Sequence, residues 1–158
     1  MIKVTVKGSQ EILKIMELMP NRMKLALLKG MRDTAIIIQS LAKKNAPVWR
    51  GLLRASIVQS VAVEGDRIVG TVGSALPYAK VLEFGRTEGW RPNIDALKVW
   101  ARRRLKDEHA GYGVAEAIRR RGFKAQSYLM PALEEAGPRA QLIFTGRILE
   151  ALAEAGGG

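Results

Sequence analysis

The sequence predicts an α+β domain, in which a long amphipathic helix packs across a small antiparallel sheet and further helices follow toward the C-terminus. Three observations lead to this prediction. Apolar residues recur at steps of three and four over residues 21–44, two β-rich runs flank the turn EGDR between residues 54 and 74, and the helical period returns after residue 93. A helix and a hairpin each bury one face, so packing one against the other forms a core.

The N-terminal part is expected to hold a short strand and two helices separated by a proline. Residues 2–6, IKVTV, are rich in β-branched side chains, which favours a strand. Apolar residues between 12 and 19 indicate a short helix that Pro20 interrupts. The long helix then runs from about residue 21 to residue 44, and Pro47 ends it. Its apolar stripe consists of Met23, Leu27, Met31, Thr34, Ile38 and Leu41.

The hairpin is the clearest β signal in the chain. Its strands are expected over residues 57–63 and 68–72, on either side of the turn. The next segment, YAKVLEFG after Pro77, fits a third strand or a turn of helix, because its apolar positions do not decide the period. Residues 86–93 are typical of a loop.

Two helices are predicted to follow this loop. The first is amphipathic and covers residues 94–105, and the polar segment 106–113 breaks it. The second is short, covers residues 114–121 and ends at Gly122, since glycine favours the left-handed conformation that closes a helix.

The C-terminal part is expected to begin extended or turned and to become helical after Pro131. Gly137 and Pro138 interrupt this helix, and an amphipathic segment that is helical or partly strand follows them. We expect one domain over residues 1–154 and a flexible tail over residues 155–158.

Composition excludes several classes of site. The chain of 158 residues has no cysteine, so disulfides, thiolate zinc sites and cysteine nucleophiles are excluded. No apolar run of about 18 residues is present, so no membrane span is expected. His109, the single histidine, lies in a polar loop without partner ligands or a nucleophile motif. We therefore expect no enzyme activity, no cofactor, no metal and no small-molecule substrate, and an unrecognised carboxylate site at Glu83 is the weaker alternative.

Positive charge is concentrated in one stretch. The net charge is +11, and between Lys98 and Lys124 nine basic residues face three acidic ones. Two triplets stand out there: Arg102, Arg103, Arg104 and Arg119, Arg120, Arg121. Three consecutive residues fan around about 200° of a helix, so neither triplet points one way. The alternatives are a solvated surface, a contact with phosphates, or a contact with acidic residues of a neighbouring subunit.

Two aromatic residues near this stretch could stack on nucleic-acid bases. They are Trp100 and Tyr112. Trp100 shares helical phase with Leu97, which favours a place in the core instead.

Three blocks of sequence carry a resemblance to a known family. They are APVWRGLLRASI at residues 46–57, PYAKVLEFG at residues 77–85 and SYLMPAL at residues 127–133. In this order they resemble the minor tail or tail-completion proteins of long-tailed bacteriophages, which include Z-type and head–tail joining components. The matching positions are Ala46, Pro47, Gly51, Leu53, Arg54, Ser56, Ile57, Pro77, Tyr78, Ala79, Glu83, Phe84, Gly85, Leu129, Pro131, Ala132 and Leu133.

The sequence departs from the family pattern at three places. Arg50 replaces the usual threonine or serine, Leu82 replaces a valine, and Ser127 with Tyr128 replaces a Pro-Phe pair. The first change removes a hydroxyl that could cap the turn and adds a charge.

The resemblance implies a structural virion protein of a tailed phage, a tail-completion or neck component in tail assembly and head–tail joining. Its partners would be other neck and tail proteins and further copies of itself, in a ring of six that follows tail symmetry. It would reside in the virion, and in the host cytoplasm during assembly. The basic stretch would then face acidic neighbours or the DNA that passes through. The alternative function is a stand-alone basic nucleic-acid-binding protein.

We interpret the first block as the corner that connects the long helix to the first strand of the hairpin, because Gly51 permits a backbone turn that other residues resist. Trp49, Arg50 and Arg54 are expected to be exposed there, available to a partner. A lid on the core is the alternative for Trp49, and a salt bridge to Glu83 is the alternative for Arg54. Structural roles are expected for Pro47, Gly51, Tyr78, Glu83, Phe84, Gly85 and Pro131.

Overall fold

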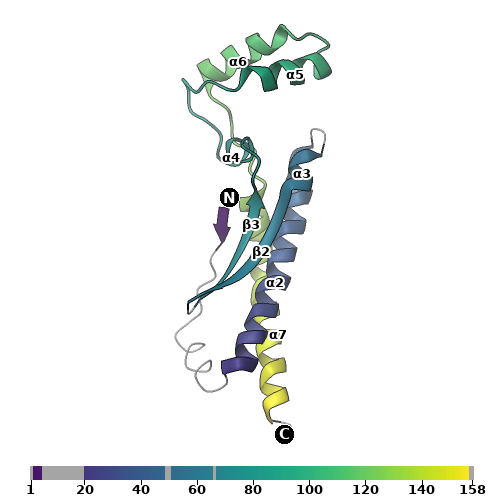
Figure 1. Ribbon diagram of the computed structural model, residues 1–158, viewed down its shortest axis with the longest axis vertical. Helices are drawn as coiled ribbons and strands as arrows, with labels where there is room; N and C mark the ends of the chain where they lie inside the picture. The colour runs from purple at the N-terminus through teal and green to yellow at the C-terminus, as the bar shows by residue number, and fades with distance from the viewer. Residues whose placement is uncertain (1, 5–19, 49–50, 66, 157–158) are drawn as a thin grey trace. The chain divides into compact units, whose positions relative to one another are not determined.

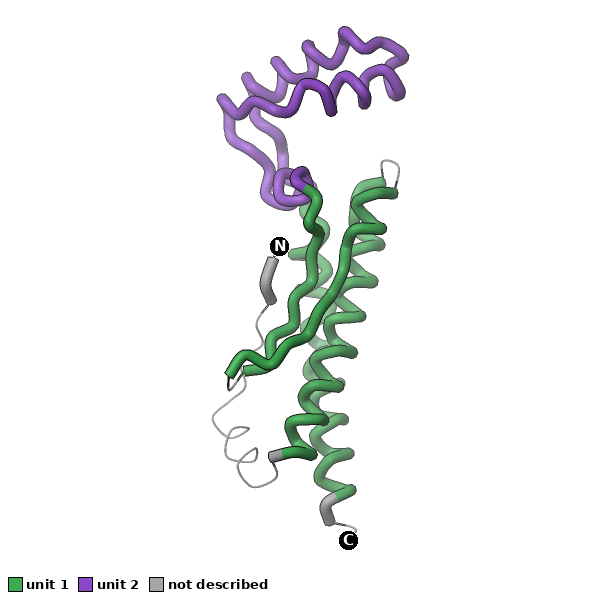
Figure 2. Tube along the Cα trace, in the orientation of Figure 1, with its two compact units in different colours: residues 1–76, 127–158 green, residues 77–126 purple. Residues whose placement is uncertain are grey.

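The computed structural model describes residues 2–4, 20–48, 51–65 and 67–156. The chain divides into two compact units, which Figure 2 shows in different colours. Unit 1 consists of Met1–Leu76 and Ser127–Gly158, and unit 2 of Pro77–Gln126. The single domain expected over residues 1–154 stays a prediction, as does the flexible tail.

Unit 1 contains an antiparallel sheet of three strands in the order β1-β3-β2 (Figure 1). The strands are β1, Ile2–Val4, β2, Ile57–Glu64, and β3, Arg67–Ser74. The register pairs Ile57 with Ser74 at one end of the hairpin and Glu64 with Arg67 at the turn, where Gly65 has a φ of 63°. The predicted hairpin and the first strand are confirmed, and β1 rather than the segment after Pro77 supplies the third strand.

Helix α2, Pro20–Asn45, crosses the face formed by β2 and β3 (Figure 1). All six residues of the predicted apolar stripe are buried. The helix lies so close to the sheet that a Cβ added at Gly70 of β3 would be 2.8 Å from the Sδ of Met31. Burying a side chain such as Met31 contributes about 1.5–3 kcal/mol, so this stripe holds helix and sheet together. The helix expected between residues 12 and 19 lies outside the described residues.

Helix α7, Leu129–Gly156, packs antiparallel along α2. The guanidinium of Arg22 at the start of α2 donates a 2.7 Å hydrogen bond to the carbonyl oxygen of Glu154 near the end of α7. The predicted interruption at Gly137 and Pro138 is wrong, because α7 continues through both residues. Pro138 removes one helical hydrogen bond, but it is exposed, and the contact with α2 runs along both sides of it. Packing on α2 therefore overrides the local signal.

A single helical turn, α3, Leu52–Ser56, joins α2 to β2. The β-rich region expected from residue 54 thus begins with helical residues, and β2 starts three residues later. The turn stays helical because Leu53 enters the core and Gly51, with a φ of 72°, redirects the chain before it.

Unit 2 consists of three helices and their loops. They are α4, Ala79–Phe84, α5, Ile94–Arg104, and α6, Ala110–Arg121. The side chain of Asn93 caps α5 by accepting hydrogen bonds from the backbone amides of Asp95 and Ala96, and Gly122, with a φ of 72°, follows α6. Helix α6 begins four residues before the predicted start, because the glycines of AGYG are part of it. Within the described residues, no helix is long and apolar enough to cross a membrane.

Candidate interaction site

The corner after α2 is held by Arg54, one of the residues expected to meet a partner. Its Nε donates to the carbonyl oxygen of Ala46 at 3.4 Å, and its Nη2 donates to that of Lys44 at 3.3 Å. These carbonyls belong to the end of α2, where the last acceptors lack helical partners. The positive charge also lies at the negative end of the helix dipole. Arg54 is exposed, but its hydrogen bonds give it a structural role in closing α2.

Side-chain hydrogen bonds tie α3 to β3 and α2 to the start of β2. The hydroxyls of Ser56 and Ser74 are 2.8 Å apart, and Ser74 also accepts from the backbone amide of Leu76. The Nε2 of Gln39 on α2 donates to the carbonyl oxygen of Ile57 at 2.8 Å. The serine and isoleucine of the first block therefore fix the position at which β2 leaves the corner.

The surface beside this corner is apolar and exposed. Val48 and Leu52 stand on either side of the turn, and both side chains are largely accessible to solvent. Pro47 is half-buried and Gly51 adopts the left-handed conformation, and the structural roles expected of both stay predictions. Trp49 and Arg50, the other predicted partner contacts, lie outside the described residues.

The second block forms α4 and the turn that ends it. Glu83 is buried, with 1% of its surface exposed, whereas Phe84 beside it is exposed. Burial raises the pKa of the Tyr78 phenol above its usual value. The alternative pairing of Arg54 with Glu83 stays a prediction.

Gly85 occupies a position that only glycine can fill. Its φ is 69°, and an added Cβ would lie 2.5 Å from the carbonyl oxygen of Phe123 and 2.8 Å from the amide nitrogen of Ala125. The next residue, Arg86, exchanges two 2.8 Å backbone hydrogen bonds with Phe123. The segments that enter and leave the α5–α6 pair are thus joined directly, and the glycine of the second block makes this possible.

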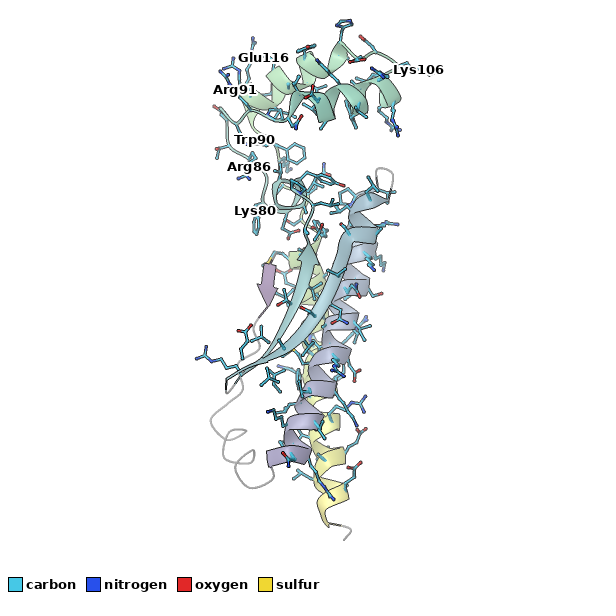
Figure 3. The ribbon with its side chains drawn as sticks, in the orientation of Figure 1. Lys80, Arg86, Trp90, Arg91, Lys106 and Glu116 are labelled. Atoms are coloured by element: carbon cyan, nitrogen blue, oxygen red, sulfur yellow. The ribbon has the colours of Figure 1, made fainter. Side chains whose placement is uncertain are left out.

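The two arginine triplets lie at opposite ends of the α5–α6 pair. Arg102 at the end of α5 is bound to Glu108 in the loop before α6, whereas the carbonyl oxygen of Arg119 accepts from the amide of Gly89 in the loop before α5. An 11-residue helix is about 16 Å long, which separates the triplets. Figure 3 shows the same separation, with Lys106 at one end and Glu116 toward the other. The contiguous basic stretch of the sequence is therefore two clusters.

Acidic side chains neutralise part of each cluster. Glu116 accepts hydrogen bonds from Arg119 and Arg120 at 2.7–2.8 Å, and these bonds lower the pKa of its carboxyl to about 2. The ion pair with Arg102 likewise lowers the pKa of Glu108. Among the described residues, no ion pair involves Arg103, Arg104 or Arg121. These three exposed guanidinium groups are the ones best placed to bind an acidic partner.

Cations lie over two aromatic rings of unit 2, and one of these rings, Tyr112, was expected to stack on bases. The Nζ of Lys98 lies 4.6 Å from the centre of the Tyr112 ring, and the guanidinium of Arg86 lies 5.7 Å from that of Trp90. A hydrogen bond with Tyr112 raises the pKa of Lys98. Trp100 is half-buried on α5.

The third block starts α7 and places three of its residues in the core. Tyr128, Leu129 and Ala132 are in the core, and Pro131 occupies the first turn of the helix, where proline is tolerated. His109 is exposed just before α6 and donates its backbone amide to the Asp107 carboxylate. Within the described ranges, no three His, Asp or Glu side chains are placed to hold a metal ion.

Two exposed apolar surfaces are not predicted from the sequence, namely the outward faces of α2 and α7. The first exposes Leu25 and Ile36, and the second exposes Leu142, Leu149 and Leu152. The leucines at 142, 149 and 152 are spaced by seven and three residues, which is a signal for one face of a helix. The predicted break at Pro138 prevents the sequence from assigning this face to one long helix.

Residues 11–85 match the family model described as "Bacteriophage HK97-gp10, putative tail-component". The match is a similarity to a phage tail-component family over this part of the chain. It spans the long helix, the corner, the hairpin and the second block, and it confirms the resemblance found in the sequence. A structural role in the tail of a bacteriophage virion is thereby supported. Neither the curated proteins nor the solved structures include a match to the chain.

Proposed function

We propose that this protein is a tail-completion or neck component that takes part in tail assembly and head–tail joining through oligomeric protein contacts. The observation that carries the proposal is that the tail-component match ends at Gly85, so it includes both the corner and the second block. In the virion the copies form a ring of six, in keeping with tail symmetry, and bind other neck and tail proteins.

The proposed role is non-enzymatic, because the motif residues act as structural supports. Arg54 binds helix-end carbonyls, Ser56 joins the corner to β3, and Gly85 permits a close backbone approach. Side chains used in this way position surfaces rather than reacting groups. Surface complementarity between subunits is then the mechanism, with no turnover.

The partners of unit 2 are acidic surfaces of neighbouring tail or neck proteins. Residues 77–126 contain twelve basic and six acidic side chains, a net charge of +6 out of +11 for the chain. The free guanidinium groups of Arg103, Arg104 and Arg121 would supply the contacts. A contact with the DNA that passes through the neck would use the same groups.

A native mass measurement on nuclease-treated protein, over a range of concentrations at low and high salt, tests this proposal. We expect a discrete oligomer free of nucleic acid. A strict monomer that rebinds duplex DNA, with an affinity that falls steeply with salt, would instead support the second candidate, a stand-alone nucleic-acid-binding protein. The observation that favours that candidate is the charge of unit 2.

A further inference from the structure

We propose that the outward face of α7 on one copy packs antiparallel against the outward face of α2 on the next copy. The contact is heterologous, since two different surfaces meet, and such a contact closes into a ring when its rotation allows. The inference rests on the proposed oligomeric function and assigns the surfaces that carry it.

The α7 face is an apolar seam on the side of the helix away from α2. Leu142 is 75% exposed and Leu149 is 60% exposed, with Leu152 also exposed. Their spacing of seven and three residues places them on one side of a helix, as in a coiled-coil seam. Ala132 and Ala136 are buried on the opposite side. A seam of exposed leucines on a helix whose other side is already packed is suited to a second helix.

The α2 face is apolar like the α7 face. The charged residues of α2 are mostly basic, whereas those of α7 are mostly acidic. Leu25 is 57% exposed and Ile36 is 51% exposed, and both lie opposite the buried stripe of the helix. Lys29 and Arg32 lie between them on this face. Over its full length α2 has six basic residues and one acidic residue, whereas α7 has four acidic and two basic. The two faces are therefore complementary in charge.

The spacing of the residues sets the direction of the contact. In α2 the steps from Leu25 to Ile36 to Lys44 are 11 and 8 residues, and in α7 the steps from Leu152 back to Leu142 to Glu134 are 10 and 8. An antiparallel contact thus brings apolar residues opposite each other twice and places an exposed lysine opposite an exposed glutamate. Glu135 adds a second carboxylate there, although it also forms a 3.5 Å exposed ion pair with Arg139.

A parallel contact lacks this match. With Leu25 opposite Leu142, Ile36 would face Leu152, but Lys44 would then lie far from Glu134 and Glu135 near the start of α7. The antiparallel direction also agrees with ring symmetry. Within one copy α2 and α7 are antiparallel, so an antiparallel contact between copies keeps every α2 pointing the same way, as a cyclic ring requires.

Disulfide cross-linking tests the contact. Because the chain has no native cysteine, any disulfide must join the introduced residues. A chain with Ile36→Cys and Leu142→Cys should form a ladder of linked oligomers on mild oxidation. A chain with Ile36→Cys and Leu152→Cys, which the parallel contact would link, should stay largely unlinked. An equal or stronger ladder from the second chain, or none from the first, would overturn the proposal.

Reversing the charges tests independently whether two different surfaces, one on α2 and one on α7, meet in the contact. Lys43→Glu with Lys44→Glu in one chain, and Glu134→Lys with Glu135→Lys in another, should each raise the assembly concentration more than about tenfold. A 1:1 mixture should assemble again into alternating rings, because each altered face then meets its opposite. If the α2 variant assembles normally, or the mixture does not recover, the contact is not the proposed one. Unchanged circular dichroism of each chain excludes unfolding as the cause.

The two proposals can fail separately. If the wild-type protein is oligomeric but the chain with Ile36→Cys and Leu142→Cys forms no link, this contact is overturned and the oligomeric function stands. If the wild-type protein is a monomer that binds DNA and the cysteine variant forms no link, both proposals are overturned.

Discussion

Gly111 of α6 lies directly against the backbone of Lys98 in α5. A Cβ added at Gly111 would be 2.9 Å from the amide nitrogen of Lys98 and 3.0 Å from its Cα. Gly113, two residues later in the same helix, would meet nothing within 4 Å. The close approach of the two helices therefore depends on one of these glycines and not on the other.

We predict opposite effects for Gly111→Ala and Gly113→Ala. The first places a methyl group against helix backbone, which cannot move aside cheaply, so it should destabilise by about 1–3 kcal/mol. The second adds no clash and removes the entropic disadvantage of glycine in a helix, so it should stabilise by about 0.5–1 kcal/mol. Urea unfolding followed by circular dichroism measures both. Equal shifts in the same direction would contradict the assigned packing.

Replacing Arg54 should weaken the end of α2. Arg54→Met keeps much of the side-chain volume but removes the two donors to the carbonyls of Ala46 and Lys44. We expect a loss of about 1 kcal/mol and faster amide exchange in the last turn of α2. Arg103→Met, at an exposed arginine without an ion pair among the described residues, is the matched control and should change little. A similar loss in both variants would show a general charge effect.

The local patterns of α2 and the hairpin were sufficient to predict them, because each has one clear period and a clear end. Other elements depend on contacts that local sequence does not reveal. Pro138 is a strong break signal, yet packing against α2 continues α7 through it. The segment around Glu83 has no decisive period, so its sequence fits a strand as well as a helix.

The candidate site could be predicted only in part, because some of its contacts have no signal in the local sequence. The corner and its glycine were recognisable, since Gly51 must adopt a left-handed conformation there. The role of Arg54 was not, because its acceptors are backbone carbonyls, which have no sequence signature. The arginine triplets appeared as one basic stretch, and only the antiparallel arrangement of α5 and α6 separates them.

Protonation of Glu116 should loosen the end of α6 at low pH. Hydrogen bonds from Arg119 and Arg120 lower the pKa of its carboxyl from 4.5 to about 2 in the folded protein. As pH falls, the unfolded chain therefore binds the proton at a higher pH than the folded protein does. The contribution of this group to the free energy of unfolding is complete above pH 4.5 and is lost as pH falls toward 2. Since the group is exposed, the effect should weaken with added salt.

Carboxyl NMR titration measures this directly. Glu116 should titrate well below the ordinary glutamate value of 4.5, and the double variant Arg119→Gln with Arg120→Gln should return its midpoint toward that value. A wild-type midpoint near 4.5 would contradict the ion pairs at this site.

The ion pair between α2 and α7 should contribute modestly to their packing. Arg147 donates to the Oδ2 of Asp33 from Nη2 at 2.7 Å and from Nε at 3.1 Å, and it also binds Glu150 at 3.0 Å. A double-mutant cycle with Asp33→Asn and Arg147→Met should give a coupling of about 0.5–1 kcal/mol, because both side chains are about one-third exposed. The cycle of Arg147→Met with Glu150→Gln, a contact within α7, should give less. A coupling to Asp33 no larger than that to Glu150 would mean that the apolar contacts alone hold α7 on α2.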